Sequence, residues 1–155
     1  TLVTARRRPR HLMRGALAVL ALGAPFLATG CGGDGYCDAV TSHQRELSDL
    51  VSQQSPTALL QGLPALEDLQ SKAPADIKPD WQQVVGRLQA LRDALREAGV
   101  DPADYDPKKP PAGLSSEQQA AITAAATELG SSTTQSAFDA VQQQVLDVCH
   151  TPLTR

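Results

Sequence analysis

The chain has 155 residues, and its charge is divided unevenly along it. The segment before Cys31 carries five arginines and no acidic residue, whereas residues 31–155 carry nine basic and 17 acidic side chains, a net charge of −8. An acidic body repels polyanions, which excludes nucleic acid as a partner and disfavours anionic lipid headgroups. Because only 3% of the residues are aromatic, an aliphatic core of helices packed on helices is favoured over a β-sandwich.

An apolar segment follows the arginines at the N-terminus. It runs from Gly15 to about Leu27, with Arg14 before it and small residues after it. Basic, apolar and small residues in this order are typical of an export signal. The apolar run is shorter than the roughly 20 residues that a transmembrane helix needs. We therefore expect residues 1–30 to be a cleaved signal peptide.

The end of this segment resembles the lipobox of bacterial lipoproteins. Gly30 and Cys31 match its pattern and Thr29 is compatible with it, whereas Leu27 lies one place before the usual aliphatic position. The resemblance implies a diacylglyceryl group on Cys31 and an extracytoplasmic protein held on the outer face of the cell membrane. Two acyl chains anchor a protein stably, whereas one chain does not. An ordinary secretory signal with a chance cysteine is the alternative, and the arginines leave twin-arginine export open.

Two cysteines remain once Cys31 is assigned to the anchor, namely Cys37 and Cys149. In an oxidising compartment they are expected to pair, which would close a loop of more than about 100 residues worth about 4.7 kcal/mol in the chain-entropy model. Two buried free thiols are the alternative. Residues 31–35 are expected to form a lipidated tether, and residues 36–155 a helical domain.

The first half of this domain contains two predicted helical stretches. Asp34 is expected to cap a helix that runs to about Gln54, because apolar residues recur at helical spacing. Ser55 is expected to cap a short helix over 57–61, which a break at Gly62-Leu63-Pro64 separates from a second leucine-rich turn. The expected inward residues are Cys37, Val40, Leu47, Leu50 and Val51 in the first helix, and Leu60, Leu63, Leu66 and Leu69 in the broken one.

The strongest helical pattern starts at Pro79-Asp80 and ends before Gly99. Trp81 begins its apolar stripe, which continues through Val84, Val85, Leu88, Leu91 and Leu95. A tryptophan in this place is expected to fill the core, with ligand stacking as the alternative. Gly99 stands where a glycine commonly ends a helix.

The segment from Val100 to Leu114 is rich in proline and is expected to be a loop. Its three aspartates, Asp101, Asp104 and Asp106, lack the spacing of a calcium-binding loop and are expected to be solvated. Because long loops often carry binding surfaces, Asp101–Leu114 is the expected contact for a protein partner.

Two more helices complete the domain. Ser115 and Gln118 form a predicted capping box for a helix that ends near Leu129, and a second box at Ser132–Gln135 is expected to open the last helix, which ends at Cys149. Its expected inward stripe is Phe138, Val141, Val145, Val148 and Cys149. The prediction is an all-α antiparallel bundle of four to five helices, with both termini at the membrane end and the helix-joining loops facing away.

No motif of nucleophilic catalysis or phosphate binding occurs in the chain. His43 and His150 are expected at the surface and apart, without metal-ligand spacing. We expect a protein that is not an enzyme and needs neither a cofactor nor a metal. The leucine-rich segment Leu59–Leu69 with its break at Pro64 leaves a cleft for a small apolar ligand as an alternative function.

The pattern of the exported part resembles that of small lipoproteins of actinobacteria. The residues that carry the resemblance are Tyr36-Cys37, Trp81–Val85, Asp101-Pro102, Lys109–Leu114 and Val148-Cys149. It implies an envelope location and a helical body, and it implies no activity. The expected function is a non-catalytic, lipid-anchored interaction or structural module with a protein partner in the envelope.

Lipidation of Cys31 is directly testable in cells. A fatty-acid analogue supplied during growth should label the wild-type protein and leave Cys31→Ser unlabelled, because the thiol is the acylation site that the lipobox resemblance implies. Cys37→Ser serves as the matched control and should keep its label. Equal labelling of wild type and Cys31→Ser would contradict the anchor.

Overall fold

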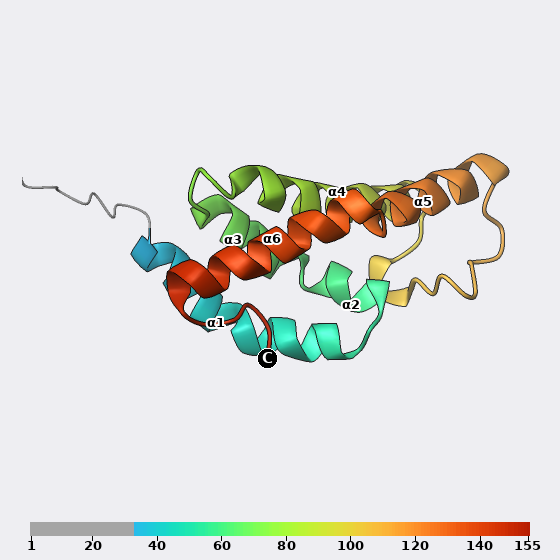
Figure 1. Cartoon of the computed structure of the whole chain (residues 1–155). Helices are drawn as coiled ribbons and strands as arrows, with labels where there is room; N and C mark the ends of the chain where they lie inside the picture. Colours follow the sequence, from blue (N-terminus) through green and yellow to red (C-terminus); the bar gives the residue numbers. More distant parts are fainter. Residues whose placement is uncertain (1–32) are drawn as a thin grey trace, which may run out of the picture.

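The computed structural model describes residues 33–155, and within this range the chain forms helices joined by turns and loops, without a strand (Figure 1). The helices are α1 (Gly33–Ser52), α2 (Pro56–Gln61), α3 (Leu63–Lys72), α4 (Lys78–Glu97), the short 3₁₀ helix η1 (Pro102–Asp104), α5 (Ser116–Leu129) and α6 (Ser132–Cys149). The predicted all-α bundle is confirmed, and the leucine-rich stretch is broken into α2 and α3 as expected. None of the described helices is both long enough and apolar enough to cross a bilayer.

The start of the domain differs from the expectation. Cys31 and the predicted signal peptide lie outside the described residues. Gly33, Asp34 and Gly35, which were expected to belong to a tether, are the first residues of α1. Asp34 therefore lies inside the helix that it was expected to cap.

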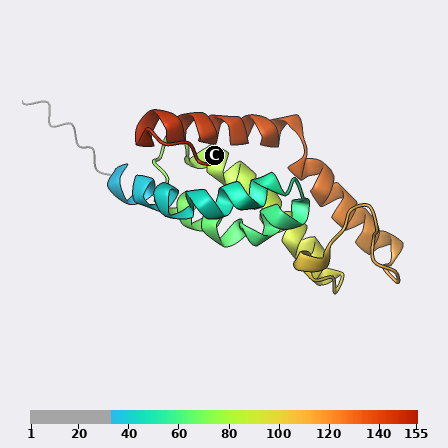
Figure 2. The same cartoon turned by 90° about the horizontal axis from the view of Figure 1, so that it is seen from below.

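Helix α4 is the central element of the bundle. It packs against α2, α3, α5 and α6, while α1 packs on α2, α3 and α6. Helices α5 and α6 follow each other with a bend between them and run antiparallel to α4 (Figures 1 and 2). Gln83 donates to the Thr134 hydroxyl at 3.2 Å, and Arg87 pairs with Glu128 at 3.6 Å. Residue numbers therefore increase along α4 as they decrease along the facing α6 and α5, which confirms the antiparallel arrangement.

A disulfide between Cys37 and Cys149 joins α1 to α6, with 5.2 Å between the two Cα atoms and 112 residues between them in sequence. This pairing is confirmed. The expectation that both termini lie at the crosslinked end is wrong for the C-terminus. His150 adopts a left-handed conformation (φ 53°) that turns the chain back, and the Arg155 amide donates to the Ser48 hydroxyl at 2.9 Å. The last residues therefore run along α1.

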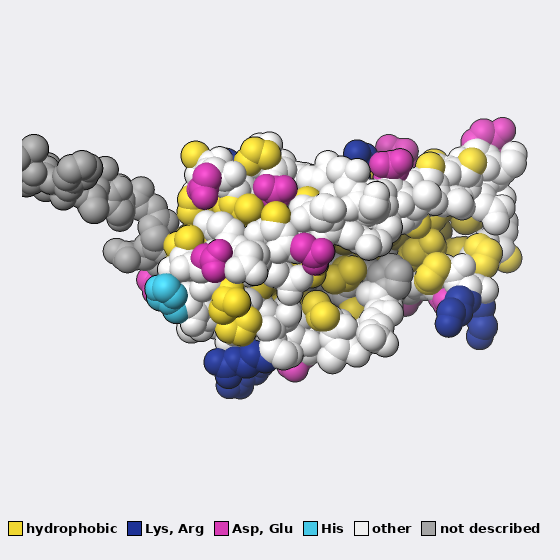
Figure 3. Space-filling view, in the orientation of Figure 1, with side chains coloured by type: hydrophobic (Ala, Val, Ile, Leu, Met, Phe, Trp, Pro, Cys, Tyr) yellow, Lys and Arg dark blue, Asp and Glu magenta, His cyan; other side chains and the backbone are white. Residues whose placement is uncertain are grey.

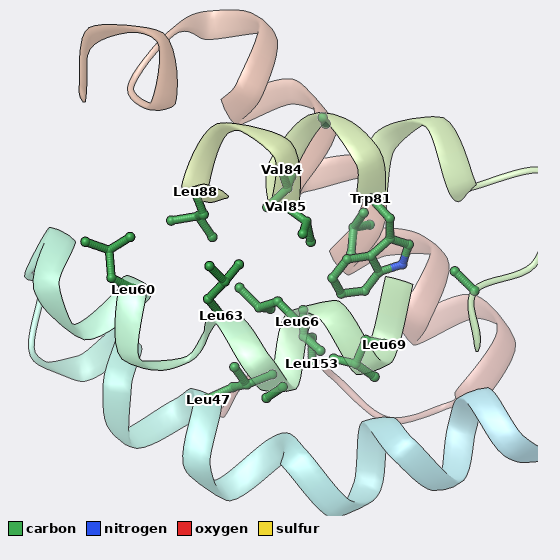
Figure 4. Packing of buried hydrophobic residues seen from close by; sticks show 14 of the residues in the cluster. Leu47, Leu60, Leu63, Leu66, Leu69, Trp81, Val84, Val85, Leu88 and Leu153 are labelled. Carbon is green, nitrogen blue, oxygen red and sulfur yellow. The ribbon is translucent and has the colours of Figure 1, made fainter. Parts of the chain in front are cut away.

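The core lies where α3 and α4 face each other (Figure 4). The leucine row of α2 and α3 is buried as predicted, and Trp81 is fully buried as a core residue. Its indole N–H donates to the Tyr36 hydroxyl at 2.8 Å, and the two rings meet edge to face. Burial raises the pKa of Tyr36, although its hydrogen bond from Trp81 opposes the shift. Tyr36 was not predicted to be a core residue, because it stands outside the apolar stripe assigned to α1.

The end of α4 and the start of α5 follow the predicted chemistry, and the start of α6 is shifted by one residue. Ser115 and Gln118 form the expected capping box, and Gly99 (φ 73°) ends α4, with the Val100 amide bonded to the Leu95 carbonyl at 2.9 Å. The predicted box at Ser132–Gln135 is wrong by one residue, because the Ser131 side chain accepts from the Thr134 amide and caps α6. Helix α5 ends at Leu129 and α6 begins at Ser132, so Ser131 stands at the capping position between them.

Two valines of the predicted inward stripes are exposed. Val51 is 38% exposed near the end of α1, and Val148 is 45% exposed near the end of α6. Each has apolar neighbours at helical spacing, but neither belongs to the core cluster. Helical periodicity alone does not indicate which positions of an apolar stripe a neighbouring helix covers.

Removal of the disulfide should destabilise the domain. Replacement of both Cys37 and Cys149 by serine should lower the free energy of unfolding by about 2–5 kcal/mol, because the unfolded chain regains the freedom that a long closed loop removes. Denaturant unfolding with a reducing agent is the control: reductant should destabilise wild type and leave the double variant unchanged. A loss below about 1 kcal/mol would show that the crosslink is dispensable for stability.

Candidate functional site

An apolar groove of about 540 Å³ opens between two walls of the bundle. One wall is the end of α1 with α2, and the other is the α5–α6 bend. Apolar side chains are visible in the hollow between these walls in Figure 3. The lining positions of α1 and α6 belong to the ends of these helices that lie away from Cys37 and Cys149. The groove therefore occupies the side of the bundle where the crosslink does not hold α1 and α6 together.

The first wall is shaped by the turn between α1 and α2. Gln54 has a positive φ of 48° there, and the Ser55 side chain then caps α2 by accepting from the Thr57 amide at 3.2 Å. This sharp turn brings Leu59 of α2 beside the last apolar residues of α1. The described lining residues of this wall are Leu50, Val51, Gln54, Ser55 and Leu59.

The floor of the groove comes from the two helices that make the core. Leu66 contributes from α3, and Val84, Leu88 and Leu91 contribute from α4. Positions 84, 88 and 91 lie on one face of a helix, so they form an elongated apolar strip along α4. The same side chains are almost fully buried. The floor is thus the edge of the hydrophobic core and is held by its packing.

The second wall depends on the bend between α5 and α6. Gly130 follows the last residue of α5, and the Thr134 hydroxyl donates to the Glu128 carbonyl at 2.8 Å across the bend. This bond satisfies a carbonyl at the end of α5 while Ser131 caps α6. The described lining residues of this wall are Ala126, Leu129, Gly130, Thr134, Gln135, Phe138 and Asp139.

The C-terminal tail closes the groove toward the disulfide. Leu153 is 1% exposed and lines a small cavity of about 20 Å³ together with Leu50, Leu66 and Phe138, which also line the groove. Gln44, itself buried, donates to the Pro152 carbonyl and holds the tail in place. The tail therefore fills the space between α1 and α6 that would otherwise continue the groove.

The polar groups of the groove are few and are already engaged or lie on its rim. The Ser55 and Thr134 hydroxyls take part in the helix caps described above. Among the described side chains that line the groove, the one ionisable group is the Asp139 carboxylate. Its composition is typical of a surface that binds apolar groups, and among the described lining residues no nucleophile lies beside a general base.

The sequence-predicted polar candidates lie elsewhere. In the loop after α4, Asp101 accepts from the Ala103 amide at 2.9 Å and Asp106 from the Lys108 amide at 2.8 Å, so both carboxylates stabilise turns. Tyr105 between them is buried, and its carbonyl accepts from the Thr57 hydroxyl. Part of the loop is therefore fixed to α2, whereas Lys108 and Lys109 are exposed.

The two histidines are not brought together. His43 lies 3.0 Å from a carboxylate oxygen of Asp68, where hydrogen bonds from Lys72 and from His43 lower the pKa of Asp68. His150 ends α6 and is exposed. In the described part of the chain, no group of three or more histidine, cysteine, aspartate or glutamate side chains is arranged to hold a metal ion.

Comparison of the chain with protein-family models, with curated proteins and with solved structures found no match. Sequence reasoning had indicated a cleft near the break at Pro64, and Leu59 and Leu66 of that segment line the groove. The opposite wall was missed, because the alanine-rich α5 and the bend at Gly130 carry no signal of a concave surface.

Proposed function

We propose that this protein is a non-catalytic, lipid-anchored protein of the cell envelope that binds a small apolar ligand in the groove between α1–α2 and α5–α6. The observation that carries the proposal is the groove, with its aliphatic floor and about 540 Å³ of volume. Ligand sites in proteins have volumes of about 300–1,000 Å³, apolar linings and few polar groups, and in helical bundles they lie between helices.

The shape of the floor supports a binding role. Burial of apolar ligand surface contributes about 25 cal/mol per Å², and Leu50, Leu59 and Leu129, which are partly exposed, offer such surface from both walls. The floor belongs to the packed core, so the site is preformed and binding needs little reordering of the protein. The single rim carboxylate and the engaged hydroxyls support binding without chemistry.

The envelope location rests on the resemblance of Thr29-Gly30-Cys31 to a lipobox. The disulfide between Cys37 and Cys149 supports it, because such bonds persist in oxidising compartments. A lipid anchor at Cys31 would place the crosslinked ends of α1 and α6 nearest the membrane. The loop Asp101–Leu114 lies at the opposite end of the bundle (Figure 1), where its exposed lysines would meet an envelope protein partner.

Binding is tested with N-phenyl-1-naphthylamine, an uncharged probe whose fluorescence rises in apolar surroundings. The full chain should bind it saturably with one site, and Ala126→Trp should weaken binding at least about tenfold, because the indole displaces two or more methylene-sized contacts. Ala124→Trp is the matched control, since Ala124 is exposed on the same helix outside the groove. Equal binding by both variants would contradict the proposal.

Two further measurements separate the alternatives. Circular dichroism and thermal unfolding should show Ala126→Trp folded, and sedimentation should show the same oligomeric state as wild type. A change of oligomeric state in this variant alone would mean that a second copy occupies the groove, against the proposal. Replacement of Lys108 and Lys109 by serine should leave probe binding unchanged and should remove an envelope partner from a pull-down.

A further inference from the structure

We infer that the crosslinked end of the bundle docks on the lipid bilayer, with the last turn of α6 immersed among the headgroups. The inference rests on the lipid anchor of the proposed function and does not depend on the groove. It follows from the length of chain between the anchor and the domain, from the exposed apolar side chains of α6, and from their positions around that helix.

The chain between the proposed anchor and the domain is very short. Only Gly32 stands between Cys31 and Gly33, the first residue of α1. Because an extended chain advances at most about 3.6 Å per residue, the Cα atoms of Cys31 and Gly33 lie no more than roughly 7 Å apart. The headgroup layer on each side of a bilayer is itself about 5–7 Å thick. A diacylated Cys31 would therefore hold the start of α1 at the headgroups, with no tether to lift the domain away.

The start of α1 shares its end of the bundle with the end of α6 and the start of α4 (Figure 1). The disulfide holds the Cα atoms of Cys37 and Cys149 5.2 Å apart, and Trp81 in the first turn of α4 donates to Tyr36. Cys37 lies four residues from Gly33, which is about 6 Å of helix. A tilt of the bundle toward α6 therefore brings its last turn to the headgroups.

Exposed apolar side chains gather in this last turn. Among the side chains that the structure describes, three large apolar ones are exposed. Two of them, Leu146 and Val148, are each 45% exposed and lie within three residues of Cys149. The third, Val51, lines the groove near the other end of α1. Immersion of the last turn of α6 would remove its two aliphatic side chains from water, which favours contact with the bilayer interface.

The positions of Leu146 and Val148 around the helix indicate the shape of the partner. Residues two apart in an α-helix are rotated by about 200°, so these side chains project from nearly opposite sides of α6. A protein or ligand that lies along one side of α6 would cover one of them and leave the other in water. A lipid layer that meets the end of the helix surrounds the last turn and contacts both.

The charges at this end limit how deep the contact goes. Asp38 of α1 and Asp147 of α6 are exposed there, and a carboxylate is costly in the hydrocarbon core. The contact therefore stays at the depth of the headgroups. Two aliphatic side chains are a weak membrane signal in solution, but a covalent anchor makes the contact intramolecular and raises its effective concentration. Docking is thus a property of the lipidated protein.

The test uses the full lipidated protein, whose mass reports the acylation, in phosphatidylcholine nanodiscs that contain a lipid with a nitroxide on its headgroup. Methyl NMR signals of Leu146 and Val148 should lose intensity, because the nitroxide broadens signals of nearby nuclei. The signal of Val51 should keep its intensity, because Val51 lies 18 residues from Gly33, about 27 Å along α1. Circular dichroism verifies that each variant is folded.

Val148→Asp should restore most of the Leu146 signal, because the added carboxylate opposes immersion of the last turn. Val51→Asp is the matched control: it adds the same charge at another exposed valine and should leave the loss at Leu146 unchanged. Loss at none of the three residues in an acylated, nanodisc-bound protein, or equal loss at all three, would overturn the inference and leave the anchor intact. A purified protein without an acyl group would instead reject the anchor, and the docking with it.

Discussion

The covalent bond between Cys37 and Cys149 is the constraint on which the arrangement of the bundle depends. It fixes the start of α1 against the end of α6, although the two helices are far apart in sequence. Helix α6 packs directly on α4, whereas α1 packs on α3, which in turn packs on α4. Held at one end, the two helices leave room at the other, where α2 and the bend at Gly130 form the facing walls. The groove is thus a consequence of helices that are joined at one end of the bundle.

The core and the C-terminal tail determine how much of that space remains open. The hydrogen bond from Trp81 to Tyr36 ties α4 to the first turns of α1 beside the disulfide, so a buried noncovalent contact reinforces the crosslinked end. Leu153 fills the next layer. Beyond it the side chains of α3 and α4 are covered on one side by their own core and face the groove on the other. Stability and a preformed floor therefore come from the same residues.

Much of the fold follows from sequence patterns, and the groove follows from them only in part. Apolar periodicity and capping signals located the α-helices, whereas η1 lies in a segment predicted to be a loop. The leucine row and Trp81 were buried as predicted. Val51 looked like a core residue because an apolar stripe has the same spacing whether a helix or a groove faces it. The return of the tail depends on the positive φ of His150, which no spacing rule indicates. Helix bends and chain reversals set the distances between helices, and these distances create the concave surface.

The most direct measurement is methyl NMR of the leucine-labelled full chain with N-phenyl-1-naphthylamine added. The account predicts nuclear Overhauser contacts from the probe to methyl groups of Leu50, Leu59 and Leu129, which line the groove and are partly exposed. Leu69 and Leu95, which are fully buried away from the groove lining, should show none. Contacts confined to exposed residues such as Leu146, or no contacts to the three groove leucines, would contradict the account.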